Sequence, residues 1–300
     1  MKFVVTGGAG FIGSYIVKHL LKQGHQVTVI DNFWRGRLEN LTGHEEQIDL
    51  QKLDILDFNS LKNIISKCDG IFHQAALTSV PESFIQKERY HDVNVVGTEN
   101  IFKLAKEFTV KVVYASSSSV YGNTASIPIK ENFERKPINP YGVTKLDDEK
   151  LAEKYHDLGV SIIGLRYFNV YGIGQTNDYA GVITKFHNKI QADNSPLILG
   201  DGSQVRDFVS VNDIAKANLL AMQSVTDFSF LNIGTGIPTS IKELANLMVN
   251  LSGKSLEIKF DKLPEGDIKE SQADVSLAKK MINWSYETTL EDGLENFFFS

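Results

Sequence analysis

Short apolar runs and amphipathic segments alternate along the first half of the chain. Buried parallel strands are typically short runs of apolar and β-branched residues, and such runs occur at residues 3–5, 26–30, 69–73, 111–115 and 160–165. Between them, apolar residues recur every three or four positions, most clearly at 94–107 and 141–158, as in a helix with one buried face. The pattern predicts an α/β fold with a doubly wound parallel sheet covered by helices on both faces.

The pattern changes after about Tyr171, where the segments become shorter and more mixed. An apolar patch at 196–199 is followed by a helix from Asn212 and a strand at 230–233. A helix at 240–251, a strand at 256–260 and an amphipathic helix at 290–299 come after them. We therefore expect one domain over residues 1–171, to which some later segments return, and mainly a smaller α/β cap over residues 172–300. No Pro/Gly/Ser-rich linker separates them, so we expect close packing with a cleft between them.

The chain has 300 residues, with 31 Lys and Arg against 37 Asp and Glu and a formal net charge of −6. A hydrophobic content of 42% permits a sizeable core and excludes a disordered chain, while the acidic balance disfavours nucleic-acid binding. No apolar stretch approaches the ~18 residues of a membrane helix, and residues 1–7 lack the apolar core of a signal peptide. Cys68 is the single cysteine and cannot form an internal disulfide, so we expect a cytoplasmic protein without a membrane partner.

A glycine-rich turn, TGGAGFIG at residues 6–13, joins the first predicted strand to the first helix. Its glycines satisfy G-x-G-x-x-G, which provides a tight turn, close backbone approach to a pyrophosphate and close packing of the helix on the strand. The free N–H groups at the start of the helix then face the phosphates. The motif predicts a Rossmann-type fold and a dinucleotide in contact with Gly7, Gly10, Phe11, Ile12 and Gly13.

An acidic residue ends the second predicted strand and strengthens this prediction. Asp31 follows the last glycine of the turn by 18 residues, where a carboxylate accepts hydrogen bonds from the ribose hydroxyls of NAD and repels a 2′-phosphate. Asp31 predicts NAD as the cofactor, although NADP stays open because Arg35 and Arg37 are close by in the sequence. Asp54-Ile55 follows the third strand and either hydrogen-bonds the adenine or caps a turn.

A tyrosine and a lysine four residues apart form a second candidate site. Tyr141 and Lys145 lie at the start of the predicted helix 141–158 and therefore share one helix face. A free tyrosine hydroxyl titrates near about 10 and is a poor base at neutral pH, but a nearby ammonium and a positively charged nicotinamide would stabilise its phenolate.

Four serines follow the predicted strand 111–115. A hydroxyl at the carboxyl end of a central parallel strand points into the crevice where ligands bind, so one serine would complete a proton-transfer set with Tyr141 and Lys145. The alternative for this run is a flexible polar loop, and the residues alone leave Ser116, Ser117 and Ser118 as rivals.

These motifs occur together in the order and spacing of one protein family. They lie at 6–13, 31–32, 73–76, 94–98, 116–122, 141–145, 165–172, 200–208 and 266–274. The sequence resembles the extended short-chain dehydrogenases/reductases and, among them, the nucleotide-sugar 4-epimerases that act on UDP-glucose or UDP-N-acetylglucosamine. The resemblance covers nearly the whole chain, and its motifs are more specific for the family than for the substrate.

The resemblance implies a reaction in which NAD stays bound and is regenerated in each cycle. Tyr141 would take the proton of the sugar 4-hydroxyl while the C4 hydride moves to the nicotinamide, and hydride would return to the opposite face of the 4-keto sugar. Lys145 would tune Tyr141, and Ser117, four residues before Tyr121, would hydrogen-bond the reacting oxygen. The further cofactor contacts that the resemblance implies are Asn32, Arg35, Gly36, Gln74, Ala75, Ala76, Asn94, Ser116 and Phe168.

The resemblance also assigns contacts with a UDP-sugar substrate. Asn169 and Arg206 would bind the diphosphate, because an Arg supplies a charge-assisted fork that the acidic chain otherwise lacks. The alternatives are a turn role for Asn169 and a surface ion pair of Arg206 with Asp207. The remaining implied contacts are Thr78, Asp267, Ser271, and, beside the uracil, Leu197 and Leu199.

Three sequence details distinguish subfamilies of these nucleotide-sugar enzymes. Sugar 4,6-dehydratases carry an Asp-Glu pair where Ser118 and Ser119 stand, and a hydroxyl cannot replace that acid–base pair. Ser271 stands where epimerases restricted to plain hexoses often carry a bulky Tyr, so a 2-acetamido group would have room. Pro264 replaces an Arg that serves many relatives as a second phosphate ligand, so either Lys262 reaches the phosphate instead or Arg206 carries more of the binding.

Rival functions and a dimer also follow from the resemblance. UDP-glucuronate 4-epimerase or decarboxylase and dTDP-glucose 4,6-dehydratase are the rival activities, and a non-catalytic NAD sensor is disfavoured by the intact Tyr141 and Lys145. We expect no metal site. A homodimer would form through helices near 92–108 and 145–158, where Leu104, Ala105 and Phe108 either make an apolar stripe or face the sheet.

Overall fold

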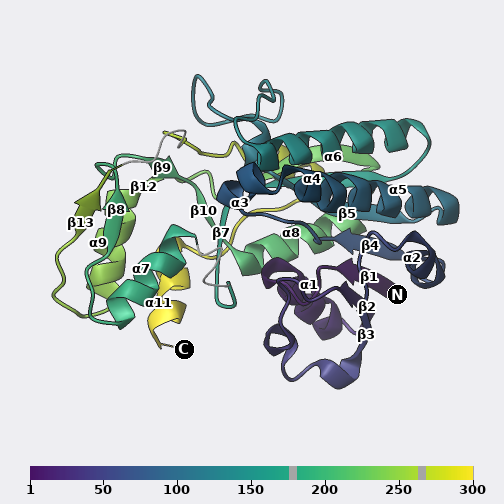
Figure 1. Cartoon of the computed structure of the whole chain (residues 1–300), viewed down its shortest axis with the longest axis horizontal. Coiled ribbons are helices and arrows are strands. Elements are labelled where there is room, and N and C mark those ends of the chain that lie inside the picture. Colours follow the sequence, from purple (N-terminus) through teal and green to yellow (C-terminus); the bar gives the residue numbers. More distant parts are fainter. Residues whose placement is uncertain (176–180, 263–267, 300) are drawn as a thin grey trace.

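A seven-stranded sheet forms the centre of the larger part of the molecule (Figure 1). The computed structural model describes residues 1–175, 181–262 and 268–299. The strands are all parallel and follow the order β11-β6-β5-β4-β1-β2-β3. Their bounds are β1 Lys2–Thr6, β2 Gln26–Asp31, β3 Ile48–Lys52, β4 Gly70–His73, β5 Lys111–Ser117, β6 Ile162–Tyr167 and β11 Phe228–Ile233. The predicted doubly wound α/β fold is confirmed.

Two apolar cores cover the two faces of this sheet because successive strand residues point to opposite sides. On one face, Val5 packs with residues of α1 and α8, and on the other Val4 packs with residues of α2, α5 and α6. All these helices run along the sheet in Figure 1. The helix bounds are α1 Phe11–Lys22, α2 Phe58–Ile65, α3 Val80–Ile85, α4 Lys87–Tyr90, α5 Gly97–Phe108, α6 Pro140–Asp157, α8 Val211–Gln223 and α10 Ser276–Ile282.

The smaller part of the molecule has its own apolar core and lies at the left of Figure 1. It is built around Ile190, Ile198 and Leu244, which are fully buried. Its helices are α7 Val182–Gln191, α9 Ile241–Leu251 and α11 Leu290–Phe299. Three short strand pairs form separate sheets outside the main one: β7 Asn169–Tyr171 with β10 Phe208–Ser210, β9 Val205–Arg206 with β12 Thr239–Ser240, and β8 Leu197–Leu199 with β13 Lys259–Asp261.

Several local predictions change in the folded chain. The strand predicted at 256–260 is shorter and shifted to Lys259–Asp261, and the helix predicted at 94–107 is a π-helical segment, His91–Val96, continued by α5. α8 and β11 follow Tyr171 in sequence but belong to the main sheet and its covering helices. The domain division near Tyr171 stays a prediction.

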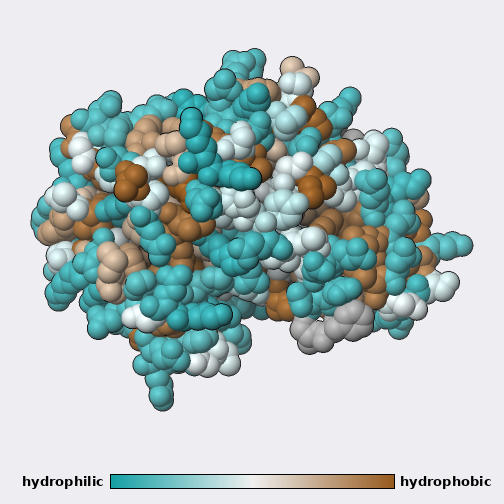
Figure 2. All heavy atoms as spheres, turned by 180° about the vertical axis from the view of Figure 1, so that it is seen from behind, coloured by the Kyte–Doolittle hydropathy of each residue, from teal (hydrophilic) through white to brown (hydrophobic). Residues whose placement is uncertain are grey.

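The outer surfaces of α5 and α6 are polar. Leu104 and Ala105 are fully buried against the sheet, and Phe108 packs on the same core, so the apolar stripe faces inward. The outward surfaces instead carry ion pairs such as Lys154 with Glu99 at 3.1 Å. The face seen in Figure 2 is likewise mostly hydrophilic, with apolar residues in scattered patches. No helix among the described residues is long and apolar enough to cross a bilayer.

Candidate active site

A cavity of ≈ 790 Å³ opens at the carboxyl ends of the central strands, where ligands bind in doubly wound sheets. Residues of both parts of the molecule line it, from Gly7 in the first turn to Phe208 in β10. Most of the residues proposed from the sequence lie there: Gly7, Gly10, Phe11, Ile12, Gly13, Asp31, Asn32, Arg35, Gly36, Asp54, Ile55, Gln74, Ala75, Ala76, Thr78, Ser116, Ser117, Tyr141, Lys145, Phe168 and Asn169.

The glycine turn forms a cradle that side chains would fill. Gly7 has φ +67°, a left-handed conformation that glycine adopts without strain, and its N–H donates to Ile30 O at 2.7 Å. A Cβ on Gly13 would overlap the carbonyl oxygen of Gly7. The N-terminus of α1 thus lies open to the cavity, as a bound pyrophosphate requires, and the turn fits NAD.

The carboxylate of Asp31 is held rigidly beside this turn. It accepts hydrogen bonds from Ala9 N at 3.0 Å and Phe33 N at 2.8 Å, and burial raises its pKa. A Cβ on Gly36 would lie 2.6 Å from Asp31 Oδ1, so only glycine lets the next loop pass so close. Nearby, Asn32 Nδ2 donates to Asp54 Oδ2 at 2.8 Å, which links the second and third strand ends.

Two contacts between the loop after β2 and the segment α3–α4 were not foreseen from the sequence. Arg89 lies over the Trp34 ring, with Cζ 3.6 Å from the ring centroid, and Arg35 Nη2 pairs with Glu82 Oε1 at 3.2 Å. Trp34, Arg35 and Arg89 all line the cavity near Asp31. A Trp three residues after the acidic strand end, flanked by Arg35, was the one signal available in the sequence.

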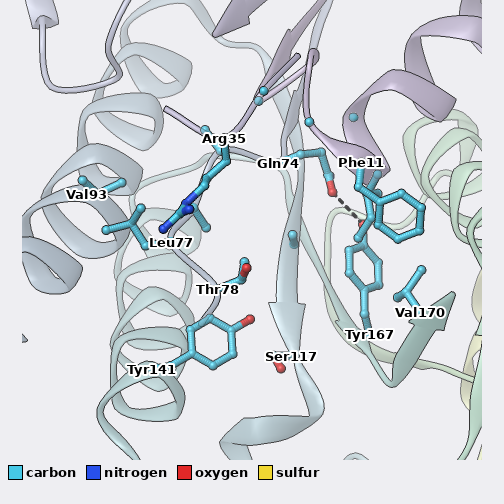
Figure 3. A pocket seen from close by; sticks show the side chains of 18 of the residues that line it. Phe11, Arg35, Gln74, Leu77, Thr78, Val93, Ser117, Tyr141, Tyr167 and Val170 are labelled. Carbon is cyan, nitrogen blue, oxygen red and sulfur yellow. Dashed lines mark hydrogen bonds between the residues drawn. The ribbon is translucent and has the colours of Figure 1, made fainter. Parts of the chain in front are cut away.

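The hydroxyl of Tyr141 points into the cavity towards Thr78 and Ser117 (Figure 3). Local structure fixes Tyr141 at the first turn of α6, because Pro140 opens the helix and Asn139 caps it by accepting Gly142 N at 2.8 Å. Its own N–H donates to Ser83 Oγ at 3.2 Å.

The two rival serines at the end of β5 have different environments. Ser116 Oγ donates to the buried carboxylate of Glu149 at 2.7 Å. Ser117 is the next strand residue and points the other way, with its oxygen at the cavity beside Tyr141 and accepting Ser119 N at 3.1 Å (Figure 3). Ser118 is not among the lining residues. The geometry favours Ser117 as the hydroxyl that reaches a ligand.

Lys145 lines the cavity from a buried position one turn after Tyr141. Its Nζ donates to Ala115 O and to Asp148 Oδ2, each at 3.1 Å. Asp148 is fully buried and was not identified from the sequence. An acidic residue three positions after a helical Lys is too common to be a signal by itself.

Asn94 does not line the cavity, as a cofactor contact would require. It is fully buried and outside the cavity lining, where its side chain accepts Leu77 N at 2.8 Å and donates to Leu77 O and Thr144 Oγ1, each at 3.0 Å. These bonds use both ends of the amide, so Asn94 holds the loop that precedes Thr78 rather than facing the cavity.

Of the predicted substrate contacts in the smaller part, Leu197, Leu199, Arg206 and Ser271 lie outside this cavity lining, whereas Asn169 lines the cavity. Leu197 and Leu199 flank buried Ile198 and are about two-fifths exposed, as alternation in β8 dictates. Arg206 Nη1 donates to Val205 O at 2.9 Å, and Ser271 N donates to the same carbonyl at 3.1 Å. Asp207 instead accepts backbone N–H groups of the segments that follow β11 and precede α10. Pro264 and Asp267 lie outside the described residues.

Residues 3–234 match the model of the NAD dependent epimerase/dehydratase family. The chain belongs to this family. The UDP-glucose 4-epimerase of Mycolicibacterium smegmatis is 35% identical over 304 residues, covering 98% of this chain and 96% of that protein. The predicted family and NAD dependence are therefore confirmed.

Solved structures of epimerases superpose closely on this member of the family. The UDP-N-acetylglucosamine 4-epimerase of Methanobrevibacter ruminantium, in complex with UDP-N-acetylmuramic acid, has a TM-score of 0.95 and 36% identity, covering 99% of this chain and 96% of that one. The UDP-glucuronic acid 4-epimerase of Bacillus cereus, in complex with UDP-glucuronic acid and NAD, has a TM-score of 0.92 and 32% identity, covering 99% and 98%. Relatives thus act on sugars of three kinds.

Proposed function

We propose that this protein interconverts UDP-hexoses that differ at C4, both UDP-glucose with UDP-galactose and UDP-N-acetylglucosamine with UDP-N-acetylgalactosamine. One observation carries the proposal: Tyr141, Ser117 and Lys145 line the same cavity as the glycine cradle, with Lys145 bonded to the β5 carbonyl of Ala115. The intact set argues against a non-catalytic sensor of NAD.

Each side chain of this set has its own role in the proton transfer. NAD, when bound, supplies a reversible hydride acceptor for C4. Tyr141 acts as the base for the 4-hydroxyl and returns the proton on reversal, while the buried Lys145 ammonium stabilises its phenolate. Ser117 and Thr78 donate or accept hydrogen bonds at the reacting oxygen and hold the sugar near Tyr141. Phe168 excludes water beside the nicotinamide position.

The charges of the cavity favour a neutral sugar. Its positive side chains, within the described residues, are Lys145, Arg35 and Arg89, and each already has a partner: Asp148, Glu82 and Trp34 respectively. A uronate carboxylate bound near Tyr141 would therefore lack a dedicated cation. The small Ser271 supports acceptance of a 2-acetamido group.

The smaller part supplies the contacts with the nucleotide. Asn169, on β7 at the cavity wall, and Arg206, on β9, bind the diphosphate, and the exposed Leu197 and Leu199 flank the uracil. A homodimer through α5 and α6 remains part of the proposal. The ion pairs on their outer surfaces make that interface polar.

Product analysis tests the proposal directly. The purified protein is incubated without added NAD with UDP-glucose, UDP-N-acetylglucosamine and UDP-glucuronate in separate reactions, and products are identified by NMR. We expect C4 epimers from the first two, and loss of both in Tyr141→Phe but not in Val143→Ala, a matched change on the exposed side of α6. A C6 methyl signal would indicate a dehydratase, and no epimer from any substrate would refute the proposal.

A further inference from the structure

The ammonium of Lys145 has two buried acceptors, and one of them is a carboxylate. The side chains of Lys145 and Asp148 are 4% and 0% exposed, and their 3.1 Å contact is made out of reach of solvent. The Ala115 carbonyl takes a second N–H of Lys145. Lys145 thus keeps its third N–H for the cavity, in a direction set by these two acceptors.

A carboxylate at this place opposes the role proposed for Lys145. An isolated ammonium would attract a phenolate on Tyr141, whereas an ionised Asp148 cancels that charge at close range. A protonated Asp148 leaves the positive charge intact. The protonation of Asp148 therefore decides the net charge of the Lys145–Asp148 pair, which lies on the same helix as Tyr141.

Burial raises the pKa of Asp148 into the physiological pH range. Desolvation raises its pKa to about 7, and the nearby charge of Asp147 also raises it, against the lowering effect of Lys145 and the Thr98 hydroxyl. Its second oxygen, Oδ1, has no hydrogen-bond partner of ordinary geometry among the described residues. An unpaired buried oxygen favours the neutral acid, because ionisation would leave it unsolvated.

Two other groups around Asp148 stay neutral near pH 7 because they are buried. On β4, burial lowers the pKa of His73 to about 3, and its ring bonds to Thr98 on α5 at 2.9 Å. On β5, burial raises the pKa of the Tyr114 hydroxyl well above its usual value. On α6, Asp147 pairs with Lys150 on the exposed side. Asp148 is thus the group whose charge changes.

We propose that Asp148 is a positioning residue of the catalytic site, whose carboxyl holds Lys145 in place and whose proton sets how strongly Lys145 stabilises the Tyr141 phenolate. The inference rests on the proposed function, since it assumes that Tyr141 acts as the base. It predicts that loss of the Asp148 charge makes the phenolate form at lower pH.

The test is a pH titration of the NAD-bound protein without any sugar. Phenolate absorbance is recorded for Asp148→Asn, for Asp157→Asn as an exposed carboxyl at the end of α6, and for wild type, each minus its Tyr141→Phe counterpart. At a given pH above neutrality, where wild-type Asp148 is ionised, we expect about tenfold more Tyr141 phenolate in Asp148→Asn, and a titration like that of wild type in Asp157→Asn. A second readout is the pH profile of NADH formation on mixing with UDP-glucose, which should lose one ionisation only in Asp148→Asn.

A titration of Asp148→Asn that coincides with wild type, or that moves to higher pH, overturns the inference. If Asp148→Asn does not fold, Asp148→Ser removes the same charge with a smaller side chain and gives the same readout. Because the phenolate titration needs no turnover, its outcome is independent of the sugar chosen. Failure to epimerise any UDP-sugar would refute the proposed function separately.

Discussion

Arg89 lies flat over the indole of Trp34, with its Cζ 3.6 Å from the ring centroid, and both side chains line the cavity near Asp31. They come from the loop after β2 and from α4, so their contact joins two segments across the cofactor end of the cavity. A cation–π pair at such a site contributes about 0.5–1 kcal/mol, and the ring also supplies part of the cavity wall.

Removal of this ring should weaken cofactor binding. We expect Trp34→Ala to raise the Kd for NAD about fivefold, since about 1 kcal/mol is lost. Calorimetric titration of NAD into cofactor-stripped protein measures the effect. Leu38→Ala is the control, because Leu38 is exposed on the same stretch and is not among the lining residues. Equal Kd values for the two variants would contradict the prediction.

Substitution of the two serines at the end of β5 should have different effects, one on activity and the other on stability. Ser117→Ala should lower turnover about tenfold or more at unchanged stability, because the hydroxyl at the cavity is lost. Ser116→Ala should instead lower the free energy of unfolding by about 1–2 kcal/mol, because it removes a donor to the buried Glu149. Turnover and urea unfolding of both variants check the pattern, and the reverse assignment would show that Ser116 faces the substrate.

The buried ion pair of Glu149 with Arg166 should be critical for folding. Glu149 is fully buried and accepts Arg166 Nε at 2.7 Å and Nη2 at 2.8 Å. Glu149→Gln leaves the buried guanidinium without a counter-charge and should cost about 3–5 kcal/mol of unfolding free energy. Glu153→Gln, which breaks the partly exposed pair with Arg135, should cost less than about 1 kcal/mol. Similar losses in urea unfolding would refute this ranking.

His73 should make the protein sensitive to acid. Its pKa is about 3 in the folded chain, because burial disfavours the charged ring, against an ordinary value of 6.5. The unfolded chain therefore binds a proton that the folded one refuses, so this contribution is complete above about pH 6.5 and is lost as the pH falls towards 3.

In urea unfolding at different pH values, we expect the free energy of unfolding to fall by up to about 1.4 kcal/mol per pH unit between pH 6 and about 4. His73→Asn should flatten that slope, whereas the exposed His91→Gln should leave it as in wild type. An equally steep slope in His73→Asn would assign the acid sensitivity to other groups.

Much of the site could be predicted because its signals are local in the sequence. The glycine turn, Asp31 at a strand end, and Tyr141 with Lys145 on one helix face depend on chain direction and on the helical and strand repeats. The apolar runs placed five of the six main-sheet strands that precede Tyr171 for the same reason, and left out β3, an edge strand without a fully buried residue. The two-residue strands β9 and β12 have no repeat to detect and could not be predicted.

Which residues meet across the fold was decided by the tertiary structure. The choice of Ser117 over Ser116 depends on which side of β5 faces α6, and the inward direction of Leu104 depends on where the sheet lies. Asp148 became relevant only once burial removed water from its pair with Lys145. Local pattern thus determined the cofactor cradle and the reacting pair, whereas packing of distant segments set the desolvation and the partners that control their charge.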